Sequence, residues 1–264
     1  MIKLFATDLD GTLLQQHTYV TNKDHIALTS ISALGVDLTF ASGRSDQEMT
    51  QLFKELGVNG HRVSQNGAFV VNKQGEVITE SHLDQKVSPH LYDVIKKKGH
   101  HFFISTRDHI HYEEKTAFIE NIQGIFKFPL KHSPTIANDL TNSTLASKFM
   151  ILAEQTDLLE LKTEIDRAFN GQIDCFLSAT KCLDIVPVGI NKAAGLNHLL
   201  QSLNIKANEL AVIGDSYNDI EMLKMTPHSF VMSTADEVVK QAGAHVVDHV
   251  YEAVEYVKDM VNAS

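Results

Sequence analysis

Two aspartates, Asp8 and Asp10, follow a short apolar stretch near the start of the chain and are themselves followed by Gly11 and Thr12. Residues 2–6, apolar apart from Lys3, have strand character, and the glycine and threonine favour a turn over a longer strand. Two ionised carboxylates at one strand end repel each other, and proteins relieve such repulsion with a bound metal ion or with a proton held on one carboxylate. The pair therefore predicts a cation site at the end of this strand.

Three more groups of polar residues stand at the ends of predicted strands or at the start of a predicted helix. They are Ser42-Gly43-Arg44 after residues 36–41, Lys192 at the start of a helix over 192–203, and the loop 214–219 with Asp215, Asn218 and Asp219 after residues 210–213. Ligands of open parallel sheets bind beyond the carboxyl ends of the strands, where residues distant in sequence converge. We therefore expect these groups and the aspartate pair to form one site.

The elements that position this site alternate between strands and helices. Thr21 or Asn22 is the expected N-cap of a helix that Gly35 closes, residues 36–41 form a strand, a helix runs from about Ser45 to Leu56, and residues 62–64 begin the next strand. This β-α-β-α-β order predicts a parallel sheet covered by helices. From residue 191 the same rhythm returns, with strands over 210–213, 228–232 and 244–247 and helices over 192–203, 235–241 and 251–261.

The middle of the chain has a different pattern. Residues 68–72 and 76–79 flank a polar Lys73-Gln74-Gly75 loop and predict a hairpin. Beyond it we expect helices over 87–98 and 157–169, strands over 101–105, 109–113, 145–153, 172–178 and 181–186, and a polar loop over 129–144. The order helix-strand-strand occurs twice, so this part predicts a separate α+β body. The fold class is thus α/β, with a core over 1–82 and 186–264 and an α+β insert over 83–185.

Composition excludes several classes of protein. The chain has 264 residues, 43% of them hydrophobic, and is long enough to form two compact bodies. Its net charge of -10 makes it too acidic to bind nucleic acid or an anionic membrane through counterion release. Without an apolar segment of about 20 residues or a signal-peptide pattern, we expect a cytoplasmic protein. Cys175 and Cys182 could face each other across a hairpin, but free thiols are expected in a reducing compartment.

The four chemistry-bearing stretches resemble, in order and type, the four motifs of the haloacid dehalogenase superfamily. The chain is most similar to the Cof-type branch, in which a large α+β cap is inserted into a Rossmann-like core between the second and third motifs. The resemblance covers essentially the whole chain and includes Gln65-Asn66-Gly67-Ala68, Leu183-Asp184-Ile185-Val186-Pro187 and the run from Gly214 to Leu223. Many relatives have serine at the position of Asn191 and Asn-Ala at Thr234-Ala235, and neither departure affects a catalytic role.

The resemblance implies a role for each matching residue. Asp8 would be the nucleophile that forms an aspartyl-phosphate, Asp10 the general acid and base, and Lys192 the cation that orients the nucleophile and offsets the phosphoryl charge. Mg²⁺ would be the cofactor. The residues expected to bind phosphate are Leu9, Ser42, Gly43, Lys192 and Asn218. The residues expected at the metal are Asp8, Asp10 through its carbonyl, Asp215 and Asp219, the last either as a ligand or as an anchor behind the ligands.

Alone, several of these residues have ordinary explanations. Ser42 could simply cap a helix, Lys192 could be solvated, and Asp219 could complement a helix dipole. His109 and His111 alternate on one face of a predicted strand, where exposed histidines are expected because a third metal ligand is missing from the pattern. Only the combination of motifs favours phosphate chemistry.

The resemblance implies a Mg²⁺-dependent phosphatase that hydrolyses a small phosphorylated metabolite, such as a sugar phosphate or a phosphorylated cofactor, with the cap supplying specificity. A phosphomutase or phosphotransferase acting on sugar phosphates is the alternative, and a non-enzymatic domain that binds a metabolite phosphate is a second one. The phosphorylation domain of an ATP-driven pump is similar but has threonine at the position of Asp10 and attached membrane helices. We expect a monomer or a weak homodimer, and the sequence does not name the substrate.

Overall fold

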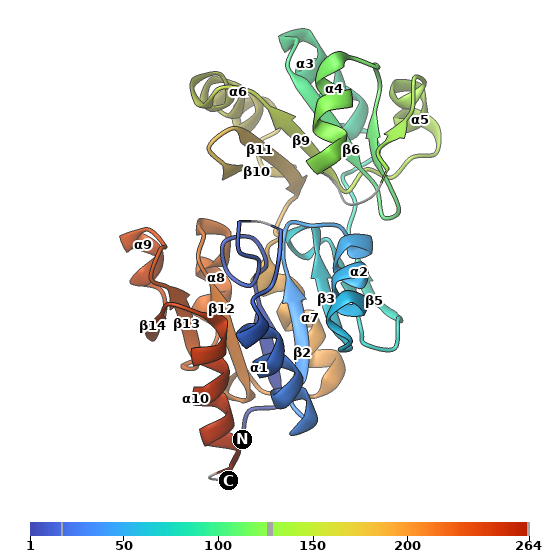
Figure 1. Ribbon diagram of the computed structural model, residues 1–264. Helices are drawn as coiled ribbons and strands as arrows, with labels where there is room; N and C mark the ends of the chain where they lie inside the picture. The colour runs from blue at the N-terminus through green and yellow to red at the C-terminus, as the bar shows by residue number, and fades with distance from the viewer. Residues whose placement is uncertain (17, 126–128, 263–264) are drawn as a thin grey trace. The chain divides into compact units, whose positions relative to one another are not determined.

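The computed structural model describes residues 1–16, 18–125 and 129–262. Its chain divides into two compact units (Figure 1). Unit 1 comprises Met1–Glu80 and Asn191–Ser264, and unit 2 comprises Ser81–Ile190. No helix within the described ranges is long and apolar enough to cross a membrane.

Unit 1 is built on an eight-stranded sheet whose first six strands are parallel. The strands β3, β4 and β5 pair antiparallel and form the predicted hairpin edge. In spatial order the strands are β14 (His245–Val247), β13 (Ser229–Met232), β12 (Leu210–Gly214), β1 (Leu4–Thr7), β2 (Asp37–Ala41), β3 (Gly60–Ser64), β4 (Phe69–Val71) and β5 (Val77–Glu80). The strands that carry the predicted chemistry, β12, β1 and β2, are direct neighbours in the middle of this sheet.

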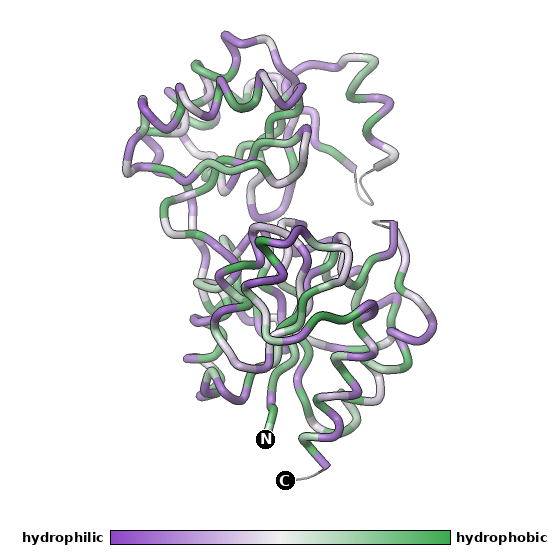
Figure 2. Tube along the Cα trace, turned by 90° about the vertical axis from the view of Figure 1, so that its left-hand side faces the viewer, coloured by the Kyte–Doolittle hydropathy of each residue, from purple (hydrophilic) through white to green (hydrophobic). Residues whose placement is uncertain are grey.

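Helices cover both faces of the sheet of unit 1. One face packs against α1 (Asn22–Ala33), α2 (Asp46–Leu56) and α10 (Val250–Asn262), and the other against α7 (Lys192–Leu203), α8 (Ile220–Leu223) and α9 (Glu237–Lys240). Strands buried on both faces are apolar on both, as in β1, where Phe5 belongs to the first cluster and Leu4 and Ala6 to the second. The helices alternate green and purple in Figure 2 because only one side of each is buried.

The helices α1, α2 and α7 begin at side-chain caps. Ser45 forms a capping box with Glu48 at the start of α2, and Thr21 accepts from the N–H of Asp24 at the start of α1. The side chain of Asn191 accepts from the N–H of Ala194, which fixes the first turn of α7. The cap at Asn191 holds the backbone of the next residue, Lys192, at a defined place.

Unit 2 is a six-stranded sheet with helices on both faces. The strand order is β10 (Ile173–Ala179), β11 (Cys182–Pro187), β9 (Lys148–Leu152), β6 (His101–Ser105), β7 (Ile110–Tyr112) and β8 (Lys131–His132), with only β7 and β8 parallel. One face packs against α3 (Val87–Lys98), α5 (Ile136–Asn142) and α6 (Gln155–Ala168). The other face packs in part against α4 (Ala117–Ile122) through Phe103, Ile110 and Leu130.

Three expectations for unit 2 were wrong. The polar loop expected over 129–144 contains β8 and α5, because Ile136 and Leu140 are spaced i, i+4 and are both buried. The helix α4 was not expected at all. His111 is buried rather than exposed, with Nδ1 2.8 Å from Ser133 Oγ.

The two cysteines are free, as expected, but do not face each other. Cys175 lies opposite Ile185 and packs in the apolar cluster that includes residues of α6, whereas Cys182 lies opposite Ala179 and directs its thiol to Asp184. Burial raises the pKa of each thiol to about 12, so neither is a reactive thiolate near neutral pH.

Candidate active site

A buried group of charges lies at the carboxyl ends of β1 and β12 and at the start of α7. The ammonium of Lys192 donates to Asp8 Oδ1 at 2.5 Å and to Asp219 Oδ1 at 2.6 Å. Lys192 is 1% exposed, Asp8 3% and Asp219 0%. Desolvation works against the charge of Lys192, but the two carboxylates outweigh it and hold the pKa of the ammonium above its usual value. Lys192 is therefore a fixed, permanently charged cation rather than a solvated one.

The turn after β1 is locked to the loop after β12. Gly11 has a φ of +90°, and a Cβ at this position would lie 2.4 Å from Asp215 Oδ2. The hydroxyl of Thr12 donates to Asp215 Oδ1 at 2.5 Å. Gly11 thus lets the backbone approach Asp215 closely, and Thr12 orients its carboxylate.

Asp8, Asp215 and Asp219 can each place one carboxylate oxygen so that all three lie within 4.8 Å of one another. Burial raises the pKa of Asp8 well above its usual value despite Lys192, and Asp219 and Asp215 raise it further. Burial also raises the pKa of Asp215. Carboxylates crowded in this way fit a hard divalent cation, which would relieve their repulsion and which takes oxygen ligands.

Asp219 already has hydrogen bonds at both carboxylate oxygens. Oδ1 accepts from Lys192, and Oδ2 accepts from the N–H groups of Asp215 and Ser216, each at 2.9 Å. These contacts fix the start of the loop after β12 and the position of the lysine. The sequence left open whether Asp219 is a metal ligand or an anchor behind the ligands, and these hydrogen bonds favour the anchor.

The side chain of Asp10 is not part of this cluster, and it pairs instead with Arg44. Arg44 Nε donates to Asp10 Oδ2 at 2.7 Å and Nη2 donates to Asp10 Oδ1 at 2.6 Å, while Nη1 lies 3.5 Å from Glu48 Oε1. Such a two-pronged pair fixes both the position and the plane of a carboxylate. Because Arg44 holds the carboxylate of Asp10 away from the cluster, the backbone carbonyl is the part of Asp10 that we expect at the metal.

The predicted phosphate-binding residues lie around the same strand ends. Ser42 is buried at the end of β2, with its Oγ 3.3 Å from the N–H of Arg44. Asn218 donates through Nδ2 to Asn66 Oδ1 at 3.1 Å. The side chain of Leu9 is fully buried, and its carbonyl accepts from the N–H groups of Thr12 and Leu14, so any phosphate contact would use its backbone N–H.

Direct contacts thus join Asp8, Asp215, Asp219 and Lys192, and a second set joins Asn218 to the turn that follows β3. Sequence reasoning gave no role to Arg44 or Asn66. A signal for Arg44 existed, because an arginine directly after Ser42-Gly43 on β2 stands beside the acidic turn of the neighbouring strand β1.

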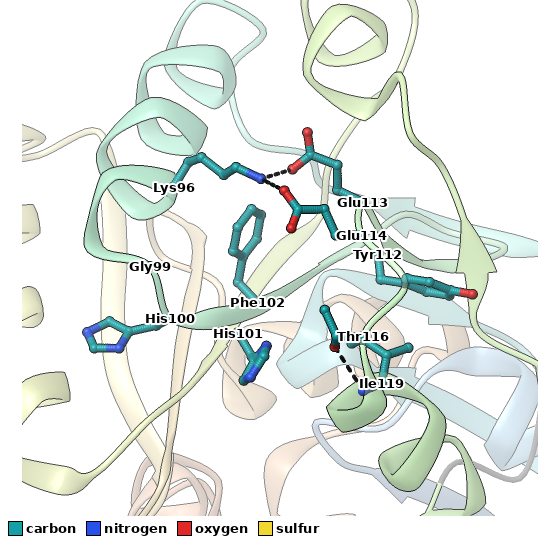
Figure 3. A pocket seen from close by; sticks show the side chains of 10 residues that line it. All are labelled: Lys96, Gly99, His100, His101, Phe102, Tyr112, Glu113, Glu114, Thr116 and Ile119. Carbon is teal, nitrogen blue, oxygen red and sulfur yellow. Dashed lines mark hydrogen bonds and ion pairs between the residues drawn. The ribbon is translucent and has the colours of Figure 1, made fainter.

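Unit 2 contains a separate cavity of ≈ 200 Å³. Lys96 in its wall donates to Glu113 and Glu114 at 2.6 and 2.5 Å (Figure 3). One ammonium against two carboxylates leaves this wall with excess negative charge, which disfavours a phosphoryl group.

Comparison with known proteins agrees with this geometry. A family model for haloacid dehalogenase-like hydrolases matches residues 5–256. An HMP-PP phosphatase from Yersinia pseudotuberculosis is 28% identical over 254 residues, which cover 91% of this chain and 87% of the relative. A haloacid dehalogenase-like hydrolase from Bacteroides thetaiotaomicron has a TM-score of 0.88 and 28% identity, and the match covers 97% of this chain and 100% of that one. A protein from Thermotoga maritima has a TM-score of 0.87 and 25% identity, with 97% of both chains covered.

The family model spans nearly the whole chain, and solved structures of the same kind share the Rossmann-like α/β fold over almost their full length. The chain therefore belongs to the haloacid dehalogenase-like hydrolases and is an enzyme of their Cof-type phosphatase branch.

Proposed function

We propose that this enzyme is a Mg²⁺-dependent phosphatase that hydrolyses a small phosphorylated metabolite through an aspartyl-phosphate on Asp8. One observation carries the proposal. A buried lysine holds Asp8 at 2.5 Å, in a cluster of carboxylates whose excess negative charge suits a divalent cation. Phosphoryl transfer depends on positioning and electrostatic stabilisation, and this cluster offers both.

Asp8 attacks the phosphorus in this proposal. Lys192 holds Oδ1 and so fixes the plane of the nucleophilic carboxylate, and Asp219 fixes Lys192 in turn. The carboxylates of Asp8 and Asp215, with the carbonyl of Asp10, would hold Mg²⁺, which when bound supplies positive charge for the phosphoryl oxygens. Ser42, the N–H groups of Leu9 and Gly43, and Asn218 bind the remaining phosphoryl oxygens.

Asp10 is the proton carrier. It protonates the departing oxygen of the substrate and then takes a proton from the water that hydrolyses the aspartyl-phosphate. The contacts of Arg44 keep its carboxylate separate from the nucleophile, so the two aspartates do different work although they are two positions apart. Because Arg44 favours the ionised carboxylate, protonation of Asp10 requires this pair to loosen during the reaction.

Residues 83–185, within unit 2, act as the cap that supplies substrate specificity and excludes water during catalysis. The curated relatives are named as HMP-PP phosphatases, so HMP-PP is the first substrate to test, followed by sugar phosphates and phosphorylated cofactors. The enzyme works in the cytoplasm, as a monomer or a weak homodimer.

A screen of phosphorylated metabolites with detection of free phosphate tests the proposal. We expect Mg²⁺-dependent release of phosphate from at least one metabolite at a rate well above that from a generic aryl phosphate. Phosphate that appears on a second sugar rather than in solution would indicate a phosphomutase. Tight metabolite binding without turnover would indicate a binding domain.

A further inference from the structure

The turn Gln65-Asn66-Gly67, which follows β3, joins three of the loops around the site. The N–H of Asn66 donates to the carbonyl of Ser42 at 2.9 Å, and Asn66 Oδ1 accepts from Asn218. A Cβ on Gly67 would lie 2.4 Å from the carbonyl oxygen of Asn191, so the turn also packs closely on the start of α7. The strands β12, β1, β2 and β3 are consecutive in the sheet, which makes this turn the fourth strand end at the site.

The backbone of this turn is strained. Gln65, Asn66 and Gly67 have φ values of 49°, 59° and 102°, and the first two are not glycines. Residues of this kind adopt positive φ at a cost, and strained residues concentrate at functional sites. Asparagine tolerates the left-handed region better than most residues, which accounts for its backbone but not for the burial of its side chain.

The side-chain amide of Asn66 has an open donor. Asn66 is 1% exposed, and its Nδ2 has no hydrogen-bond partner among the residues that the structure describes. Buried donors are nearly always paired, so an exception at a ligand site indicates a bond that the ligand completes. The amide lies against Gly43, where a Cβ would be 3.4 Å from Nδ2, and it contacts Asn218 on its other side. Both neighbours are residues to which phosphate binding is assigned.

We propose that Asn66 is a further phosphate-binding residue, whose Nδ2 donates to an oxygen of the phosphoryl group while Oδ1 orients Asn218. The inference rests on the proposed phosphatase function. The contact pairs the neutral Nδ2 donor of Asn66 with a charged phosphoryl oxygen that the same site binds. A hydrogen bond to a charged acceptor is stronger than one between two neutral groups. Asn66 thus contributes to the binding of both substrate and inorganic phosphate.

Two substitutions distinguish the effect of losing the Nδ2 donor of Asn66 from the effect of disturbing the backbone of the turn. Asn66→Asp keeps the shape and the acceptor for Asn218 but replaces the donor with a negative charge. Asn66→Gly keeps the positive φ and removes the side chain. Asn204→Gly and Asn204→Asp are matched controls, because Asn204 has a φ of 52° at the end of α7 in the same unit and is exposed.

The test measures inhibition of aryl phosphate hydrolysis by inorganic phosphate, with Mg²⁺ present, together with the thermal midpoint of each variant. We expect the inhibition constant for phosphate to rise about tenfold or more in Asn66→Gly and further in Asn66→Asp, with no change in the Asn204 controls. Wild-type inhibition constants in both Asn66 variants would overturn the proposal. So would loss of phosphate binding in Asn66→Gly alone, because that pattern assigns the effect to the acceptor rather than to the donor.

A measurement on the wild type covers the case in which both variants fail to fold. The side-chain amide signals of Asn66 in ¹⁵N-labelled protein should shift when inorganic phosphate is added with Mg²⁺, while those of Asn204 stay in place. Unmoved Asn66 signals at saturating phosphate would refute the contact. A wild type that hydrolyses no aryl phosphate would overturn the proposed function and this inference with it, whereas an active wild type whose Asn66 variants keep the wild-type inhibition constant for phosphate refutes the inference alone.

Discussion

Replacing Asp8 with asparagine should destroy activity and at the same time stabilise the metal-free fold. Burial raises the pKa of Asp8 in the folded state, so an ionised carboxylate at this position lowers the stability of the fold. The amide of Asp8→Asn has no charge to bury and no repulsion with Asp215 or Asp219. It can still accept from Lys192, which also keeps Asp219 at 2.6 Å.

The raised pKa of Asp8 gives the sign of the first effect: the free energy of unfolding of metal-free Asp8→Asn should rise. Each 1 kcal/mol of that rise moves the thermal midpoint up by about 2–4 °C for a body of this size. Loss of the nucleophile should lower kcat by about 10⁴-fold or more.

The assay combines aryl phosphate turnover with thermal unfolding in the presence of a chelator and then in excess Mg²⁺. The wild type should gain more stability from Mg²⁺ than the variant, because the variant has lost a carboxylate ligand. Asp24→Asn is the matched control: Asp24 is buried in unit 1 but accepts from Thr21 Oγ1 and from the N–H of Tyr251, so its loss should lower the midpoint and leave turnover intact. A metal-free Asp8→Asn that melts well below the wild type, or that keeps substantial turnover, would refute this account of the site.

Three other outcomes are expected. Chelation of Mg²⁺ should stop hydrolysis and weaken phosphate binding reversibly, and activity that survived exhaustive chelation would argue against the metal role. Arg44→Met should lower kcat by about 10–100-fold by releasing Asp10, with little change in the inhibition constant for phosphate, and Arg44→Lys should restore little because it lacks the fork. Burial, with the nearby charges of Lys131 and His109, lowers the pKa of His111 to about 4, below its unfolded value of about 6.5. The contribution of neutral His111 to the free energy of unfolding should thus be fully present above about pH 6.5 and decrease as the pH falls toward 4. At pH 5 the loss should be at most about 2 kcal/mol. Urea unfolding of the wild type and of His111→Gln at pH 7 and pH 5 measures this loss, which the variant should largely lack.

Strong local signals made most elements of the fold predictable from sequence. The bounds of α3, β6 and α7 agree with the expected residues, because an apolar face of helical period or an apolar β-rich run defines each one. Residues 129–144 contain prolines and asparagines, which predict a polar loop, but the i, i+4 pair of Ile136 and Leu140 is buried and forms one side of α5. Short elements such as α4 and β8 depend on packing against the sheet more than on their own sequence.

The place of the site was also predictable, because the carboxyl ends of neighbouring parallel strands meet. Its internal contacts were not. Sequence spacing gives no reason for Lys192 to pair with Asp219 as well as with Asp8, or for Asp10 to pair with Arg44 instead of joining the carboxylate cluster. Positive φ at Gln65 depends on the surrounding loops rather than on the residue itself, so the turn that presents Asn66 becomes visible only in three dimensions.

Charge balance explains why these contacts should make phosphate binding depend on the cation. Three carboxylates and one ammonium leave the cluster of Asp8, Asp215, Asp219 and Lys192 with an excess of two negative charges when all four groups are ionised. A phosphoryl dianion that approached this cluster in a buried site would meet strong repulsion. A divalent cation brings the sum to zero. The fixed donors around the strand ends then meet the phosphoryl oxygens without a net opposing field, and their contribution to affinity should appear only when Mg²⁺ is present.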